Sequence, residues 1–229
     1  SNSLTIGCTY SLIDNRLRGS GLSYCVFPSA YLMYPFWKKR NPKTGRIQLN
    51  SLTPIFKKII KENSKTQFFI SLTDKYAFLK HPKNINFLYH FGKKSSVNYD
   101  MSGSFSVATG GLDLMLGISK YLGFSKVILL GCDYLGQPCM ERHFYSSNKP
   151  FIGDYKVDYV KRIRKITDQL ELDVLTIFPK GVRSTAFESK SFSEYFGVAE
   201  QYHNQSQIID DDYLELLKKA GSKNQVLLG

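Results

Sequence analysis

GGLDLMLGISKYLGFSKVILLGCD, residues 110–133, is the stretch that decides the fold. Residues 112–122 are apolar nearly all round, which is typical of a buried helix. Gly123 and Phe124 end that helix, and residues 126–131 form a continuous apolar run. Such a run is typical of a central strand in a parallel sheet.

Strand-like and helix-like segments alternate along the rest of the chain. The expected strands cover residues 4–8, 22–27, 67–72, 86–91, 126–131 and 174–178. The expected helices cover residues 53–60, 112–122, 157–170 and 184–196, with a short helical piece at 211–219. This alternation implies right-handed crossovers between parallel strands. We therefore predict an α/β, Rossmann-like fold with a mainly parallel sheet and helices on both faces. We expect a single domain over residues 1–197 and a polar C-terminal extension with one short helix over 198–229.

Two local features refine this prediction. Thr53 precedes Pro54 and the helical apolar pattern, so Thr53 is expected to cap the helix and Pro54 to occupy its first position. The polar, basic stretch 37–50 contains Pro42 and Gly45 and is expected to be an exposed loop.

The charge of the chain narrows the class of partner. Its 229 residues include 31 Lys and Arg against 19 Asp and Glu, a net charge of +12. This balance favours anionic partners: nucleotides, acidic glycans, lipid headgroups or nucleic acid. The basic runs 37–40 and 161–165 lack a nucleic-acid-binding motif, so we interpret them as solvated faces.

The cysteines and the apolar runs bear on the compartment. Cys8, Cys25, Cys132 and Cys139 show no zinc-site spacing and are interpreted as buried, reduced thiols. No apolar stretch reaches the ~18 residues of a membrane helix, and the start at Ser1 shows no signal-like pattern. A cytoplasmic location is expected, and peripheral association with the inner face of the membrane is compatible with the charge.

In parallel α/β sheets, ligands bind beyond the carboxyl ends of the strands. The residues expected on that rim are Gly7, Cys8, Thr9, Pro28, Ser29, Ser71, Thr73, Thr109, Gly110, Gly111, Asp133, Tyr134 and His143. The turn after the first strand could present backbone N–H groups to a phosphate. Gly110 and Gly111 either let a phosphate approach a helix N-terminus or pack that terminus tightly against the sheet.

Two rim side chains suggest chemistry. A carboxylate at Asp133 can bind ribose or substrate hydroxyls, ligate a metal, or cap the following loop. His143 lies in a long rim loop, and an imidazole titrates near neutral pH, so it is either a general base or a structural histidine. Its neighbours Arg142 and Tyr145 could neutralise a departing phosphate.

Three motifs carry a resemblance to a known family. They are Thr109-Gly110-Gly111 before the apolar helix, the apolar strand ending in Gly-Cys-Asp-Tyr at Tyr134, and Arg-His-Phe-Tyr at 142–145. Together they resemble the core of the bacterial sialyltransferases of glycosyltransferase family 42, related surface-polysaccharide proteins, and the archaeal-type hydroxymethylpterin diphosphokinase-like group. Residues 6–12, IGCTYSL, resemble the family's Gly-Asn-Gly-Pro-Ser-Leu nucleotide-binding turn. The likeness covers about residues 1–35 and 100–180.

The sialyltransferase resemblance implies a CMP-sugar donor, inverting transfer to a glycan or glycolipid acceptor, and no metal or other cofactor. It makes His143 the general base and gives Tyr134 or Tyr145 the role of steadying the leaving phosphate. The donor-binding positions are then Gly7, Cys8, Thr9, Ser29, Thr109, Gly110, Gly111 and Asp133. The chain departs from the family at Cys8, which stands where the family has a donor-binding Asn, and at Thr9, which replaces a glycine.

Two other function classes stay open. A pterin or small-molecule diphosphokinase would use ATP and Mg²⁺ and a second acidic residue beside Asp133. A non-catalytic nucleotide- or nucleic-acid-binding protein would show a steep salt dependence of affinity and no turnover. A homo-oligomer is compatible with each of these functions.

Overall fold

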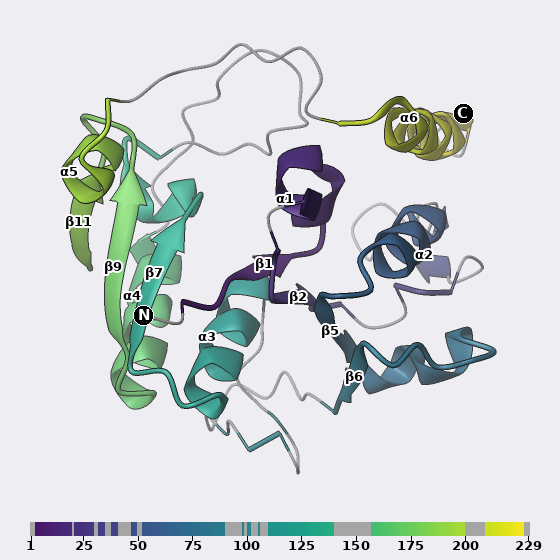
Figure 1. Cartoon of the computed structure of the whole chain (residues 1–229), viewed down its shortest axis with the longest axis horizontal. Coiled ribbons are helices and arrows are strands. Elements are labelled where there is room, and N and C mark those ends of the chain that lie inside the picture. Colours follow the sequence, from purple (N-terminus) through teal and green to yellow (C-terminus); the bar gives the residue numbers. More distant parts are fainter. Residues whose placement is uncertain are drawn as a thin grey trace. The chain divides into compact units, whose positions relative to one another are not determined.

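Parallel strands joined by helices make up the computed structural model of the chain (Figure 1). It describes residues 3–19, 21–29, 32–34, 38–40, 47–49, 52–89, 98, 100–101, 105, 110–139, 157–199 and 209–226. The chain divides into two compact units, Ser1–Met115 with Gln205–Gly229, and Leu116–Asn204. The division falls inside one continuous helix, α3 (Gly111–Tyr121).

The described strands of the first unit form a parallel sheet in the order β1-β2-β5-β6. These strands are β1 (Ile6–Cys8), β2 (Tyr24–Phe27), β5 (Gln67–Ser71) and β6 (Ile85–Leu88). The register pairs Cys8 with Val26 and Val26 with Phe69. Because paired residues of parallel strands share a face, these three side chains lie on one face of the sheet and Phe27 lies on the other.

Helices cover both faces of this first sheet. On one face, Phe56 of α2 (Thr53–Glu62) packs edge-on against Phe27, with ring centroids 5.3 Å apart. On the opposite face, Gly111 at the start of α3 lies against the Cys8 side chain. The first unit also contains η1 (Ser11–Ile13), α1 (Asn15–Gly19), η2 (Leu72–Ala77), α6 (Asp211–Val226) and a short hairpin of β3 (Lys38–Arg40) and β4 (Ile47–Leu49).

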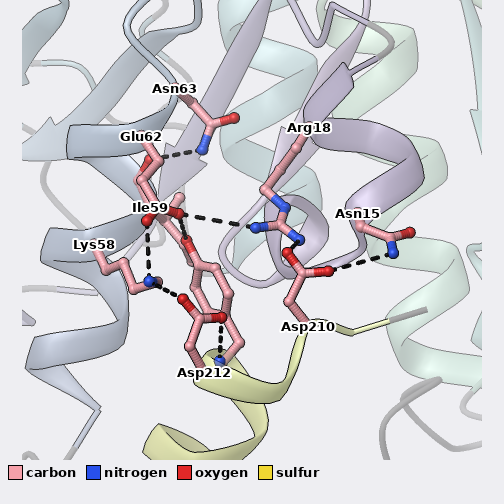
Figure 2. A network of polar contacts seen from close by, with 9 residues as sticks. Asn15, Arg18, Lys58, Ile59, Glu62, Asn63, Asp210 and Asp212 are labelled. Carbon is pink, nitrogen blue, oxygen red and sulfur yellow. Dashed lines mark hydrogen bonds and ion pairs between the residues drawn. The ribbon is translucent and has the colours of Figure 1, made fainter. Parts of the chain in front are cut away.

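The C-terminal helix belongs to the first unit and is held there by a polar network (Figure 2). The charged members of the network are Arg18, Lys58, Glu62, Asp210 and Asp212. At its centre Tyr213 is fully buried and donates a hydrogen bond from its hydroxyl to the Glu62 carboxylate at 2.8 Å. Arg18 and Lys58 each lie 4.9 Å from the centroid of the Tyr213 ring. Because the ion pairs are partly exposed and exposed pairs stabilise little, the buried ring provides most of this attachment.

The second unit contains its own parallel sheet, in the order β11-β9-β7. Its strands are β7 (Lys126–Leu130), β9 (Asp173–Phe178) and β11 (Glu188–Ser191), and α4 (Val157–Gln169) connects β7 to β9. Three short elements, η3 (Asp133–Leu135), β8 (Gly136–Gln137) and α5 (Phe192–Phe196), accompany them. Strand β8 pairs antiparallel with β10 (Arg183–Ser184).

The predicted fold class is confirmed: the protein is α/β, Rossmann-like and mainly parallel. The expected strands and the helices over 53–60, 112–122 and 157–170 are present, with ends that differ by at most three residues. The expected domain boundary near residue 197 stays a prediction. Helix α6 is longer than the helical piece expected at 211–219.

Four local predictions were wrong. Residues 37–50 contain the β3–β4 hairpin, and residues 184–196 form β11 and α5 with part of β10 in place of one helix. Thr53 is inside α2, and its hydroxyl donates a hydrogen bond to the Leu32 carbonyl at 2.8 Å in place of a capping bond. Strand β7 is at the edge of the described three-stranded sheet, with Ile128 39% and Leu130 56% exposed.

Candidate functional site

In the first unit, three parallel strands end at one edge and bring the predicted rim residues together. Thr9 follows β1, Pro28 and Ser29 follow β2, and Ser71 ends β5. The start of α3 lies at the same edge, since a Cβ added at Gly111 would meet Cys8 and Pro28. The prediction that these segments share a rim is therefore confirmed within this unit.

The turn after β1 is held in an unusual backbone conformation. Thr9 has φ of 43°, in the left-handed region that a β-branched residue rarely adopts. Its N–H donates to the Val26 carbonyl at 2.9 Å. Ser11 braces the turn, because its Oγ accepts from the Cys8 N–H at 3.0 Å and donates to the Cys8 carbonyl at 2.9 Å. The position where the resembling family has glycine is thus one whose backbone suits glycine.

The glycines at the start of α3 have different surroundings. A Cβ on Gly111 would lie 2.5 Å from the Cys8 sulfur and 3.8 Å from Pro28 Cγ, so only glycine fits there without movement. A Cβ on Gly110 would meet no atom of the described residues within 4 Å. Tight packing therefore accounts for Gly111, whereas no described residue packs against the Gly110 position. A Cβ on Gly7 would also be too close to its neighbours, at 2.7 Å from Leu22 Cδ2.

The thiol at this edge is a packing group. Burial raises the pKa of the Cys8 thiol, and a hydrogen bond with Thr9 offsets only part of that rise. The thiol therefore stays protonated at neutral pH and is a poor nucleophile. Cys25, Cys132 and Cys139 are buried as predicted, Cys8 is partly exposed, and all four are thiols outside any disulfide.

In the second unit, a different set of groups gathers at the carboxyl end of β7. Asp133 and Tyr134 lie in η3 directly after that strand, and burial raises the pKa of the Asp133 carboxyl. Burial also raises the pKa of Tyr134 strongly, and hydrogen bonds with Tyr159 and Cys132 raise it further. The Tyr134 hydroxyl therefore stays protonated and can act as a hydrogen-bond donor but not as a base.

The first turns of α4 complete this cluster with residues that the sequence analysis missed. The rings of Tyr134 and Tyr159 meet edge-on with centroids 5.2 Å apart, and the Arg162 guanidinium lies 4.6 Å from the centroid of the Tyr159 ring. Helix α4 returns from the carboxyl edge, so its first turns start at the same edge as the end of β7. The spacing of Tyr159 and Arg162 by three residues on a predicted helix was the available signal.

Some predicted site residues stay untested by this geometry. Thr109, His143 and Tyr145 lie outside the described residues. Asp133 and Tyr134 belong to the second unit and the glycines to the first, so each set is described separately. Ser29 is exposed directly after β2.

Metal-binding clusters and membrane-spanning helices are both absent from the described ranges. No group of three or more His, Cys, Asp or Glu side chains in these ranges is arranged to hold a metal ion. No helix in them combines the length and apolar character needed to cross a bilayer.

Comparison of the chain with models of known protein families, with curated proteins and with solved structures found no match. The resemblance to the sialyltransferase group therefore stays a prediction from the motifs alone.

Proposed function

We propose that the protein is an inverting glycosyltransferase of the sialyltransferase-like kind. It would transfer an acidic sugar, of the sialic acid or Kdo type, from a CMP-sugar donor to a glycan or glycolipid acceptor. The proposed setting is bacterial surface-polysaccharide synthesis in the cytoplasm, at the inner face of the membrane. The net charge of +12 suits two anionic substrates.

One observation carries this proposal: the turn after β1 and the start of α3 meet at the carboxyl edge of a parallel sheet. Unpaired N–H groups at a helix start and the helix dipole favour a phosphate at such an edge. Among the described residues, none packs against the Gly110 position, which leaves room for a ligand at its backbone. The donor phosphate is accordingly assigned to this edge, near Gly7, Cys8, Thr9, Ser29, Thr109, Gly110 and Gly111.

In the proposed reaction, one residue acts as the general base and another donates a hydrogen bond to the leaving phosphate. The acceptor hydroxyl forms a bond to the anomeric carbon of the sugar, the bond from that carbon to the CMP phosphate breaks, and His143 takes the hydroxyl proton. Tyr134 or Tyr145 donates a hydrogen bond to the departing phosphate. The raised pKa of Tyr134 supports this role, because its hydroxyl keeps the proton that it would donate. Asp133 is proposed to bind donor or acceptor hydroxyls.

A thermal-shift screen of CMP, CDP, ATP, GDP and UDP tests donor binding. A ligand at 100 times its Kd adds about 2.7 kcal/mol of apparent stability, so the proposal expects the largest shift with CMP. If ATP gave the largest shift, and gave it only when Mg²⁺ was added, the diphosphokinase hypothesis would be favoured. No shift with any of these nucleotides would contradict the proposal.

Replacement of His143 tests the proposed base. As a general base it would contribute about 10²–10⁴-fold to turnover, so His143→Ala should lose that factor while CMP affinity and melting temperature change little. His203→Ala is the matched control and should keep full turnover. Unaltered turnover in a folded His143→Ala protein would remove this residue from the mechanism.

A further inference from the structure

The connection between β5 and β6 carries the most exposed large apolar side chains in the described part of the chain. It begins as η2 and lies at the margin of the first unit (Figure 1). Tyr76 is 85% exposed, and Leu79 is exposed in full. Two apolar side chains exposed to this degree on one short connection make it a candidate surface for contact with another molecule or a membrane.

Three lysines lie close to these two residues in the sequence. They are Lys75, Lys80 and Lys83, and we refer to them with Tyr76 and Leu79 as the basic tip. No ion pair joins any of the three to another residue in the ranges that the structure describes, whereas Lys58, Lys120, Lys126 and Lys190 each pair with a carboxylate. The basic tip is therefore a local excess of positive charge beside apolar surface.

Contacts on its inner side hold the basic tip in place. The Phe78 ring meets Phe87 of β6 with centroids 6.3 Å apart, and His81 meets the same ring at 5.4 Å. Lys57 Nζ of α2 donates to the Ala77 carbonyl at 3.1 Å. Asp74 is fully buried and accepts a hydrogen bond from the Met33 N–H at 2.9 Å. Since these neighbours are anchored, the outward Tyr76 and Leu79 belong to a built surface.

The second unit offers an instructive contrast in α5. Phe192, Tyr195 and Phe196 are also exposed there. The charges nearest them in sequence are paired, Arg183 with Glu194 and Lys190 with Glu188. Exposed rings therefore occur in both units, but only the basic tip combines apolar side chains with cations that have no partner in the described ranges.

We propose that the basic tip docks the protein on an anionic lipid bilayer. Tyr76 and Leu79 would enter the interface between headgroups and acyl chains, while the three lysines would approach lipid phosphates. The net charge of +12 favours the same negatively charged surface. This proposal adds the contact surface to the membrane location given under Proposed function, and it needs neither nucleotide nor turnover to be tested.

Vesicle co-sedimentation of the full chain tests the proposal. One set of vesicles contains phosphatidylcholine and phosphatidylglycerol, and the other contains phosphatidylcholine alone. We expect binding to the anionic vesicles only, weakened by salt. Each lysine near the surface contributes a factor of about five, so Lys80→Gln with Lys83→Gln should weaken binding about 25-fold. Tyr76→Ser with Leu79→Ser should weaken binding while leaving the melting temperature unchanged.

Matched variants elsewhere on the protein distinguish the effect of the basic tip from the effect of the overall positive charge. Lys161→Gln with Lys165→Gln removes two cations from α4, and Tyr195→Ser with Phe196→Ser removes two exposed rings from α5; both should bind vesicles nearly as well as the parent. Absent vesicle binding by the parent, or equal losses in the tip and control variants, would overturn the proposal. Oligonucleotide binding that depends on Lys80 and Lys83, without vesicle binding, would overturn it in favour of nucleic acid.

Discussion

The carboxyl edges of the two sheets differ in the types of residue that form them. At the first, Gly7, Thr9 and Gly111 leave little room, and the partly exposed Cys8 thiol fills the gap between the turn and the helix. At the second, burial raises the pKa of the Asp133 carboxyl and of the Tyr134 phenol, and the Tyr134 ring meets the ring of Tyr159 edge-on. Packing space therefore decides which side chains fit at the first edge, whereas hydrogen bonding and burial decide which chemical groups are stable at the second. Changes of size should therefore affect the first edge, and changes of chemistry at constant size should affect the second.

The largest expected effect on stability is that of Gly111→Ala. The new Cβ would lie 2.5 Å from the Cys8 sulfur, so either the helix start or the strand must move. Overpacking of this kind costs about 1–3 kcal/mol, measurable by urea unfolding.

Two further variants sharpen that prediction. Gly110→Ala places its Cβ more than 4 Å from every atom of the described residues and should change stability by no more than about 1 kcal/mol, in either direction. Cys8→Ala combined with Gly111→Ala removes the clashing sulfur and should recover part of the lost stability. A double variant less stable than the sum of the single changes would show that the space-limited description of this edge is wrong.

At the second edge, Tyr134→Phe removes one hydroxyl at nearly constant size. The hydrogen bonds with Tyr159 and Cys132 are lost, which should cost about 1 kcal/mol. Tyr159→Phe removes the partner hydroxyl, so the double variant should cost less than the two single changes added together. Strictly additive losses would mean that the two phenols do not interact.

The conformation of Thr9 gives a prediction with a built-in control. Thr9→Ala and Thr9→Gly both remove the hydroxyl that contacts the Cys8 sulfur at 3.2 Å. Only glycine adopts a φ of 43° freely, so the Gly variant should be about 1 kcal/mol more stable than the Ala variant. At most positions the Ala variant is the more stable of the two. If the Thr9→Ala protein were the more stable one, the left-handed backbone at this position would be ruled out.

The smallest expected effect is a pH-dependent one at Asp133. Because burial raises its pKa, the folded state holds the proton more tightly than the unfolded state does. Its contribution to stability is therefore most favourable in acid and declines as pH rises through the folded pKa. Asp133→Asn should raise the melting temperature slightly, by up to ~3 °C, at neutral pH and leave it unchanged in acid. A variant less stable than the parent at neutral pH would contradict this sign.

Much of the fold follows from local sequence pattern. The apolar runs over β7 and β9 and the helical spacing of apolar residues in α2 and α4 predict those elements. The failures occur where pairing with a distant strand outweighs local preference. Glu188–Ser191 is polar and has no strand-like alternation, yet it pairs along its length with β9. Residues 37–50 look like a loop because Pro42 and Gly45 interrupt them, yet the segments on either side pair as a hairpin.

The candidate site likewise has features that the sequence pattern predicts and features that it does not. Two glycines before an apolar helix left two interpretations open, a phosphate site or tight packing against the sheet, and Gly111 packs tightly. The sequence could not distinguish Gly110 from Gly111, because the difference depends on where the Cys8 sulfur lies. The bracing by Ser11 and the contact of Tyr159 with Tyr134 likewise depend on distances that residue order does not determine.

Calorimetric titration of CMP into the full chain and into Gly110→Asp tests the central claim most directly. The helix dipole interacts favourably with a carboxylate at the helix start, so this variant should be as stable as the parent. The same carboxylate would repel a phosphate, so the account predicts saturable CMP binding by the parent and at least about tenfold weaker binding by Gly110→Asp. Gly110→Asn, of similar shape but neutral, should bind nearly as well as the parent. No CMP binding by the parent, or equal binding by all three proteins, would contradict a nucleotide phosphate at this edge.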